Sequence, residues 1–303
     1  MSFCQDVKKE LCKIIDKKEC CEKARLYGML SFSRSFPAET QVFTTENKTV
    51  AEHFAQSLAG LMGTFVTIHT DLRKLKDNVP MYTVLIEDKY QRDLLCSYYS
   101  INDTLLNPEF TENPCCVSAF FRGLFLLSGL VTNPEKEYHL ELVAPNSILA
   151  EEVFLLAKEY GIRFKITKRK HNDILYLKES EQIEDFLTLI GSSKFAMMLM
   201  DIKVMKDVRN KINRVTNCET ANLDKTVSAS NAQVQDILYI KENAGLNYLD
   251  DDLIELAKLR LENPELSLRE LTELLSEPLS RSGVNHRLKR ISEIAKKLKG
   301  EKK

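Results

Sequence analysis

CCEKARLYGMLSFS, residues 20–33, returns in altered form as CCVSAFFRGLFLLS at residues 115–128. Five of the 14 positions are identical at this offset of 95 residues: Cys20/Cys115, Cys21/Cys116, Ala24/Ala119, Gly28/Gly123 and Ser33/Ser128. In each segment an alanine and a glycine lie four residues apart and so share one helix face. Small residues let two helix backbones approach closely, so the pattern predicts paired helices at a pseudo-twofold axis. The alternative is two unrelated core helices with incidental glycines.

The same order of elements follows both segments. The expected hairpins are FSRSF with TQVFTT, turned at Pro37, and SGLVT with YHLELVA, turned at Asn133-Pro134. A helix follows in each half and ends at Gly63 or Gly161. Two alternating strands come next: TFVTIH and MYTVLIE in the first half, and IRFKIT and DILYLK in the second. A short helix completes each half, near 93–99 in the first and near 182–190 in the second. We therefore predict an α+β fold in which residues 1–195 contain two αββαββα halves.

Composition sets outer limits on function. The 303 residues have a net charge of -1, which by itself argues weakly against binding to nucleic acid. Eight cysteines without a CxxC pair, and no export signal, favour a reducing cytoplasm. The longest apolar stretch, 117–131, is interrupted by Arg122 and is too short for a bilayer. We expect no contact with membranes.

The sequence lacks the usual catalytic and metal-binding motifs. HExxH, GxxxxGK[ST], GxGxxG and GxSxG are all absent, and the five histidines show no metal-ligand spacing. Adjacent cysteines on a helix point about 100° apart and do not chelate as a CxxC knuckle does. We therefore interpret the cysteine pairs as buried structural thiols. No catalytic residue, metal or cofactor is expected.

Residues 196–249 are predicted to form a helical linker. Val204, Val208, Ile212 and Val215 recur at helical spacing, and a second short helix is expected at 233–242. The Asn- and Thr-rich stretch NCETANLDKT lies between them. Its side chains can cap helices or bind nucleic acid, so a structural linker and direct contact with DNA both remain open. The candidate contacts are Arg209, Asn213, Arg214, Asn217 and Lys225.

Residues 250–303 are predicted to form an all-α helix-turn-helix domain. An S-x-x-E capping box at 267–270 opens the middle helix, and a basic helix follows the turn. Residues 280–303 hold nine Lys or Arg and two Glu, a net charge of +7. Base contacts are expected from Arg281, Ser282, Asn285 and His286, and phosphate contacts from Arg287, Lys289 and Arg290. The alternative is a plain helical bundle with a basic tail.

The segments LYGMLSFSR, 26–34, and FRGLFLLSG, 121–129, resemble degenerate copies of the LAGLIDADG motif of homing endonucleases. That family carries a metal-binding acid near the end of each paired helix. The matching positions here are Ser33 and Ser128, which cannot supply the carboxylates that a hard cation needs. Glu39 and Glu135 lie beyond a turn and do not fit the motif. The resemblance implies a nuclease-like body without catalysis.

Basic residues lie on comparable strands and turns of the two halves: Arg73, Lys74 and Lys76, then Arg163, Lys165, Lys168, Arg169 and Lys170. They are equally consistent with phosphate contacts and with solvated hairpins.

A closer resemblance, to the WhiA family, covers essentially the whole chain. It rests on NPEKEYHLELVAP, VRNKINRVTNCETANLDKT and SRSGVNHRLKRISEIAKKL, and the last unit also resembles region 4 of sigma factors. It implies a sequence-specific regulator of transcription with roles in cell division, chromosome segregation and sporulation, located at the nucleoid in the bacterial cytoplasm. Expected partners are double-stranded DNA and other transcription regulators or RNA polymerase. An active LAGLIDADG endonuclease and a protein-binding adaptor remain the alternatives.

Overall fold

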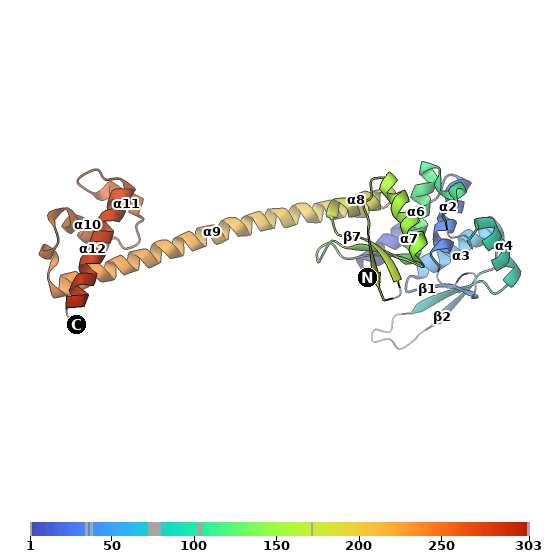
Figure 1. Ribbon diagram of the computed structural model, residues 1–303, viewed down its shortest axis with the longest axis horizontal. Helices are drawn as coiled ribbons and strands as arrows, with labels where there is room; N and C mark the ends of the chain where they lie inside the picture. The colour runs from blue at the N-terminus through green and yellow to red at the C-terminus, as the bar shows by residue number, and fades with distance from the viewer. Residues whose placement is uncertain are drawn as a thin grey trace. The chain divides into compact units, whose positions relative to one another are not determined.

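The computed structural model describes residues 2–33, 36, 39–71, 80–101, 105–170 and 172–301. Contacts divide the chain into two compact units, Met1–Lys206 and Asp207–Lys303 (Figure 1). The predicted boundaries at residues 195 and 249 concern functional domains and stay predictions.

The first unit contains two halves of like order. After α1 (Phe3–Leu11), the first half has α2 (Glu19–Ser31), β1 (Gln41–Thr45), α3 (Lys48–Met62), β2 (Thr67–Asp71), β3 (Met81–Leu85) and α4 (Lys89–Tyr99). After the short α5 (Pro108–Thr111), the second half has α6 (Pro114–Ser128), β4 (Gly129–Val131), β5 (Leu140–Ala144), α7 (Ser147–Glu159), β6 (Lys165–Arg169), β7 (Asn172–Leu177) and α8 (Ser180–Leu189). The predicted α+β class is therefore confirmed, and the predicted αββαββα order is complete in the second half. In the first half, the predicted strand FSRSF lies partly outside the described residues.

Both sheets are antiparallel, and three strands of the second sheet follow the order of the first. The first is β1-β3-β2 and the second is β4-β5-β7-β6. The strands β5-β7-β6 repeat the arrangement of β1-β3-β2, as expected of a duplication. Matching caps hold the next helix in each half: Asn47 and Asn146 accept N-terminal backbone hydrogen bonds of α3 and α7. The predicted stops are also present, since Gly63 and Gly161 have φ angles of 61° and 80°.

Helices α2 and α6 pack directly against each other through the predicted small residues. A Cβ atom on Gly28 would lie 2.3 Å from the carbonyl oxygen of Phe120, and one on Gly123 would lie 2.0 Å from that of Arg25. Ala24 is fully buried beside this crossing. Only glycine permits such contact between backbones, so the predicted helix pair is confirmed.

The second unit begins within α9 (Ser193–Asn243), a single helix of 51 residues. The helix predicted separately at 233–242 is the end of α9, because neither Gly nor Pro interrupts residues 193–243. Within NCETANLDKT, the Thr226 hydroxyl donates to the Asn222 carbonyl at 2.9 Å, so this side chain bonds back along the helix instead of ending it.

Four elements follow α9: η1 (Leu246–Tyr248), α10 (Asp251–Glu262), α11 (Leu268–Leu274) and α12 (Arg281–Glu301) (Figure 1). The capping box of α11 is complete, with Ser267 and Glu270 each accepting the other's backbone N–H. Ile237 and Ile240 of α9 are fully buried in the same core as Leu253 and Leu288. The last turns of α9 therefore form part of the C-terminal core.

Candidate nucleic-acid interface

Helix α12 presents most of the predicted DNA-binding residues on one side. Val284, Leu288, Ile291 and Ala295 dock the helix into the core. At roughly 100° per residue, Arg281, Ser282, Asn285, His286 and Lys289 lie on one arc, which begins beside Leu288 and extends to the side opposite the core. Four of them are exposed and Asn285 is half-buried, so this arc can approach a ligand.

Arg287 and Arg290 turn toward α10 instead. The Arg287 guanidinium donates to the Asp252 carbonyl at 3.1 Å and pairs with its carboxylate at 3.4 Å. Arg290 pairs with the Asp250 carboxylate at 2.7 Å. These contacts fasten α12 to the start of α10. Both side chains therefore already have partners within the domain.

A cleft of about 440 Å³ lies beside the start of α12. Arg281 and Asn285 of α12 line it together with Arg269 of α11 and Lys225 of α9. Arg260 of α10 completes a set of four cations, and no carboxylate is among the described residues that line the cleft. A cleft lined by four cations and no anion favours a negatively charged ligand.

Arg260 is a buried cation with incomplete compensation. Its side chain is 2% exposed, and its Nη1 donates to the Leu266 carbonyl at 2.6 Å and to the Ser230 hydroxyl at 3.3 Å. Burial lowers the pKa of Arg260 from its ordinary value. Among the described residues, its Nε has no hydrogen-bond partner. An anion in the cleft would offset the cost of this unpaired charge.

The structure brings together residues that the sequence treated separately. Lys225, a candidate contact from NCETANLDKT, lines the cleft beside Arg281. Arg260 and Arg269 were not predicted, although the capping box that positions α11 was. The remaining candidates on α9 are exposed and do not line the cleft: Arg209, Asn213, Arg214 and Asn217.

The ends of α2 and α6 meet at a second cleft, of about 320 Å³. Ser33 and Ser128, which stand where homing endonucleases carry acids, both line it. The Ser33 hydroxyl donates to the Val42 carbonyl, and the Ser128 hydroxyl donates to the Leu124 carbonyl at 3.0 Å. No carboxylate is among the lining residues in the described part of the chain, so this cleft lacks the ligands for Mg²⁺.

The basic residues of the second sheet are exposed on and beside β6, an edge strand. Three of them face acids: Lys165 pairs with Glu179 at 3.7 Å, Lys168 with Asp173 at 3.9 Å, and Arg169 with Glu141 at 3.4 Å. Exposed lysines on an edge strand also discourage pairing with other sheets. Phosphate contact here stays a prediction; Arg73, Lys74 and Lys76 lie outside the described residues.

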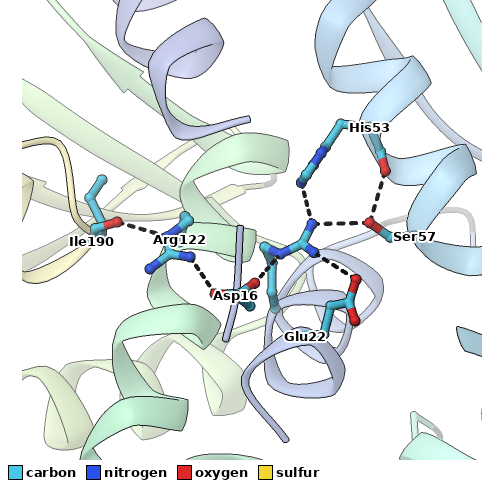
Figure 2. A network of polar contacts seen from close by, with 7 residues as sticks. Asp16, Glu22, His53, Ser57, Arg122 and Ile190 are labelled. Carbon is cyan, nitrogen blue, oxygen red and sulfur yellow. Dashed lines mark hydrogen bonds and ion pairs between the residues drawn. The ribbon is translucent and has the colours of Figure 1, made fainter. Parts of the chain in front are cut away.

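A buried polar network ties the two halves together next to the helix pair (Figure 2). Asp16 accepts from Arg25 of α2 at 2.8 Å and from Arg122 of α6 at 2.7 Å. Arg25 also donates to the His53 Nε2 and, at 3.1 Å, to Ser57. Burial, aided by the positive charge of Arg25, lowers the pKa of His53 to about 4. Asp16 thus bridges the guanidiniums of Arg25 and Arg122, which ties α2 to α6.

The cysteine prediction needs correction. Cys21 and Cys116 are buried, as expected, but Cys20 and Cys115 are exposed. Adjacent residues on a helix point in different directions, so each pair has one thiol in the core and one in solvent. The prediction that all four thiols are buried was therefore wrong.

The fold and these surfaces define a duplicated LAGLIDADG-like body that is joined to a C-terminal helix-turn-helix domain. Residues 117–209 match the family described as the WhiA LAGLIDADG-like domain, and residues 212–295 match the WhiA C-terminal HTH domain. The chain belongs to the WhiA family.

Relatives match along the full length. The chain is 36% identical over 308 residues to the probable cell division protein WhiA of Ruminiclostridium cellulolyticum, covering 99% of this chain and 98% of that protein. It is 37% identical over 311 residues to the protein of the same name from Oceanobacillus iheyensis, with 99% and 98% covered. The crystal structure of full-length WhiA from Thermotoga maritima matches with a TM-score of 0.58 and 25% identity, covering 98% of this chain and 99% of that one. Within the described residues, no helix combines the length and apolar character needed to cross a membrane.

Proposed function

We propose that the protein is a sequence-specific DNA-binding regulator of transcription that acts without catalysis. The observation that carries this proposal is the cationic cleft at the start of α12. There Arg281 and Asn285 lie beside Lys225 and Arg269, with no lining carboxylate among the described residues. The helix-turn-helix domain supports the same conclusion, because the N-terminal residues of its second helix read base edges in the major groove.

The two sets of residues have different tasks in this proposal. Arginine pairs with guanine and asparagine pairs with adenine through two hydrogen bonds each, so Arg281 and Asn285 are assigned to bases. Ser282 and His286 lie on the adjoining arc and extend the same contact. Lys225, Arg269 and Lys289 are assigned to phosphates, where a flexible cation gives affinity without sequence choice.

Binding of operator DNA by variants tests the assignment to bases. Each of Arg281→Ala and Asn285→Ala is expected to weaken specific binding by about 1–3 kcal/mol, roughly 5- to 150-fold, and to relax preference at one base pair. Lys297→Ala, which removes an exposed charge near the other end of α12, is the matched control. Fluorescence anisotropy at fixed salt measures the affinities. Equal losses in the control and in the cleft variants would contradict the assignment.

The phosphate contacts predict a different signature. Lys225→Ala and Arg269→Ala are each expected to weaken binding by a similar factor on all sequences. Each should also reduce the slope of log K against log salt by about one. An unchanged slope would count against contact between these side chains and phosphate.

Absence of catalysis is proposed from the cleft that Ser33 and Ser128 line, which offers hydroxyl groups already bonded to backbone. The chain is expected to leave plasmid DNA intact in the presence of Mg²⁺. Cleavage that Ser128→Ala or Glu135→Ala abolishes would establish an endonuclease and overturn this part of the proposal. Glu135 is exposed and does not line the cleft, which argues against that outcome.

The relatives named as probable cell division proteins support a role for this chain in the control of cell division. We extend the proposal to chromosome segregation and sporulation, and to a position at the nucleoid in the cytoplasm. Other transcription regulators or RNA polymerase are the proposed protein partners.

A further inference from the structure

Four cysteines meet at the starts of α2 and α6. The Sγ atoms of Cys20, Cys21, Cys115 and Cys116 all lie within 4.8 Å of one another. Each helix supplies two adjacent residues of its first turn, and the two pairs are equivalent at the offset of 95 residues. A single pair on one helix does not form a chelate, but the packing of α2 against α6 joins two pairs into one cluster of four donors.

The spacing suits a small tetrahedral ion. Zinc binds cysteine sulfur at about 2.3 Å, which places the four sulfurs of a regular tetrahedron about 3.8 Å apart. The four Sγ atoms lie at most 4.8 Å apart, within about 1 Å of that value. Small changes of side-chain torsion are therefore enough to bring the sulfurs to the spacing of a tetrahedral site. An all-sulfur donor set selects zinc or another soft metal and disfavours Mg²⁺ and Ca²⁺.

Two helix N-termini favour the negative charge of bound thiolates and partly offset the burial of Cys21 and Cys116. Helix N-termini carry partial positive charge and unsatisfied backbone N–H groups, and two such ends meet here. Neither Lys18 nor Asn113, the N-cap residues, makes a side-chain capping hydrogen bond. Two acids of α2 next to the cluster have partners of their own: Glu19 pairs with Lys23 at 2.8 Å, and Glu22 lies 3.7 Å from Arg25.

We propose that Cys20, Cys21, Cys115 and Cys116 bind one zinc ion that fastens the two halves of the body together. Four protein ligands leave no open coordination position, so the site is structural and not catalytic. The exposed Cys20 and Cys115 give the ion a path from solvent, and the buried Cys21 and Cys116 hold it against the core. The site lies at the opposite end of the helix pair from Ser33 and Ser128.

Metal analysis of the full-length protein tests this proposal. The chain is purified with a reducing agent and without chelators, and zinc is measured by elemental analysis. We expect about one zinc per chain. Replacement by Co²⁺ is expected to give the charge-transfer and visible bands of a tetrahedral tetrathiolate site, which report the ligands directly and independently of any variant.

Variants locate the site. The double variant Cys20→Ser with Cys115→Ser changes only exposed positions and is expected to lower zinc content at least tenfold while preserving the circular dichroism spectrum. Cys218→Ser, which removes an exposed thiol on α9, is the matched control and should retain the metal. If the double variant fails to fold, the cobalt spectrum of the unmodified chain decides the question.

Three results would overturn the proposal. The first is a reduced full-length chain that holds no stoichiometric metal and gives no cobalt–thiolate bands. The second is undiminished zinc in the folded double variant. The third is a mass four hydrogens below that of the reduced chain, which would show two disulfides among these cysteines. Cysteines joined in disulfides cannot serve as thiolate ligands.

Discussion

His53 shows how one residue couples pH to the stability of the body. Its pKa of about 4 in the folded chain lies below the ordinary 6.5, because the ring is buried and faces Arg25. Between those values the unfolded chain binds a proton that the folded chain does not. This contribution to the free energy of unfolding is therefore fully present above about pH 6.5 and is lost as the pH falls toward 4.

His53→Gln is expected to remove this loss, because glutamine can accept from Arg25 without titrating. Between about pH 7 and pH 5 the wild-type protein should lose about 1–2 kcal/mol more than the variant, after allowance for partial exposure of the ring. Urea unfolding at both pH values measures the difference. Parallel acid losses in the two proteins would show that His53 is not responsible.

The glycines at the helix crossing permit a second prediction at this scale. Gly123→Ala places a Cβ 2.0 Å from the Arg25 carbonyl oxygen, so the helices must separate. We expect a loss of about 3 kcal/mol or more in the free energy of unfolding. Gly60→Ala is the control: nothing lies within 4 Å of its Cβ, so it should stabilise α3 by about 0.5–1 kcal/mol. Similar melting temperatures for both variants would contradict close backbone packing.

At the scale of elements, the capping box makes α11 depend on one hydroxyl. Ser267 accepts the Glu270 N–H and Glu270 accepts the Ser267 N–H at 2.7 Å. Ser267→Ala is expected to cost about 1 kcal/mol and to speed hydrogen exchange in α11. Ser228→Ala, at an exposed position inside α9, should leave exchange in α11 unchanged. Equal protection of α11 in the two variants would refute the cap.

Elements with strong local signals were predictable from the sequence. The glycine stops of α3 and α7, the capping box of α11 and the paired helices all follow from local chemistry. The sequence predicted two helices in place of α9, because Asn and Thr in NCETANLDKT suit either a turn or a helix in which the side chain bonds to a backbone carbonyl. Absence of Gly and Pro was the signal that could have distinguished the two.

At the scale of the whole molecule, the sites depend on contacts between distant segments. The recognition surface was predicted on α12, but the cleft also needs Lys225 and Arg260, which come from other elements. The four thiols likewise converge only because α2 packs on α6. Periodicity along one segment cannot show such convergence. The sequence shows that Arg287 and Arg290 are charged, but only the structure shows that they pair with Asp252 and Asp250.

Genome-wide mapping of bound DNA tests the central claim, that the start of α12 selects the sequence that the protein binds. Cells producing the full-length wild-type chain are compared with cells producing the Arg281→Ala, Asn285→Ala double variant at equal protein levels. The account predicts discrete peaks with a shared sequence motif for the wild type, and loss of those peaks for the variant. Retention of the same peaks and motif by the variant would contradict it.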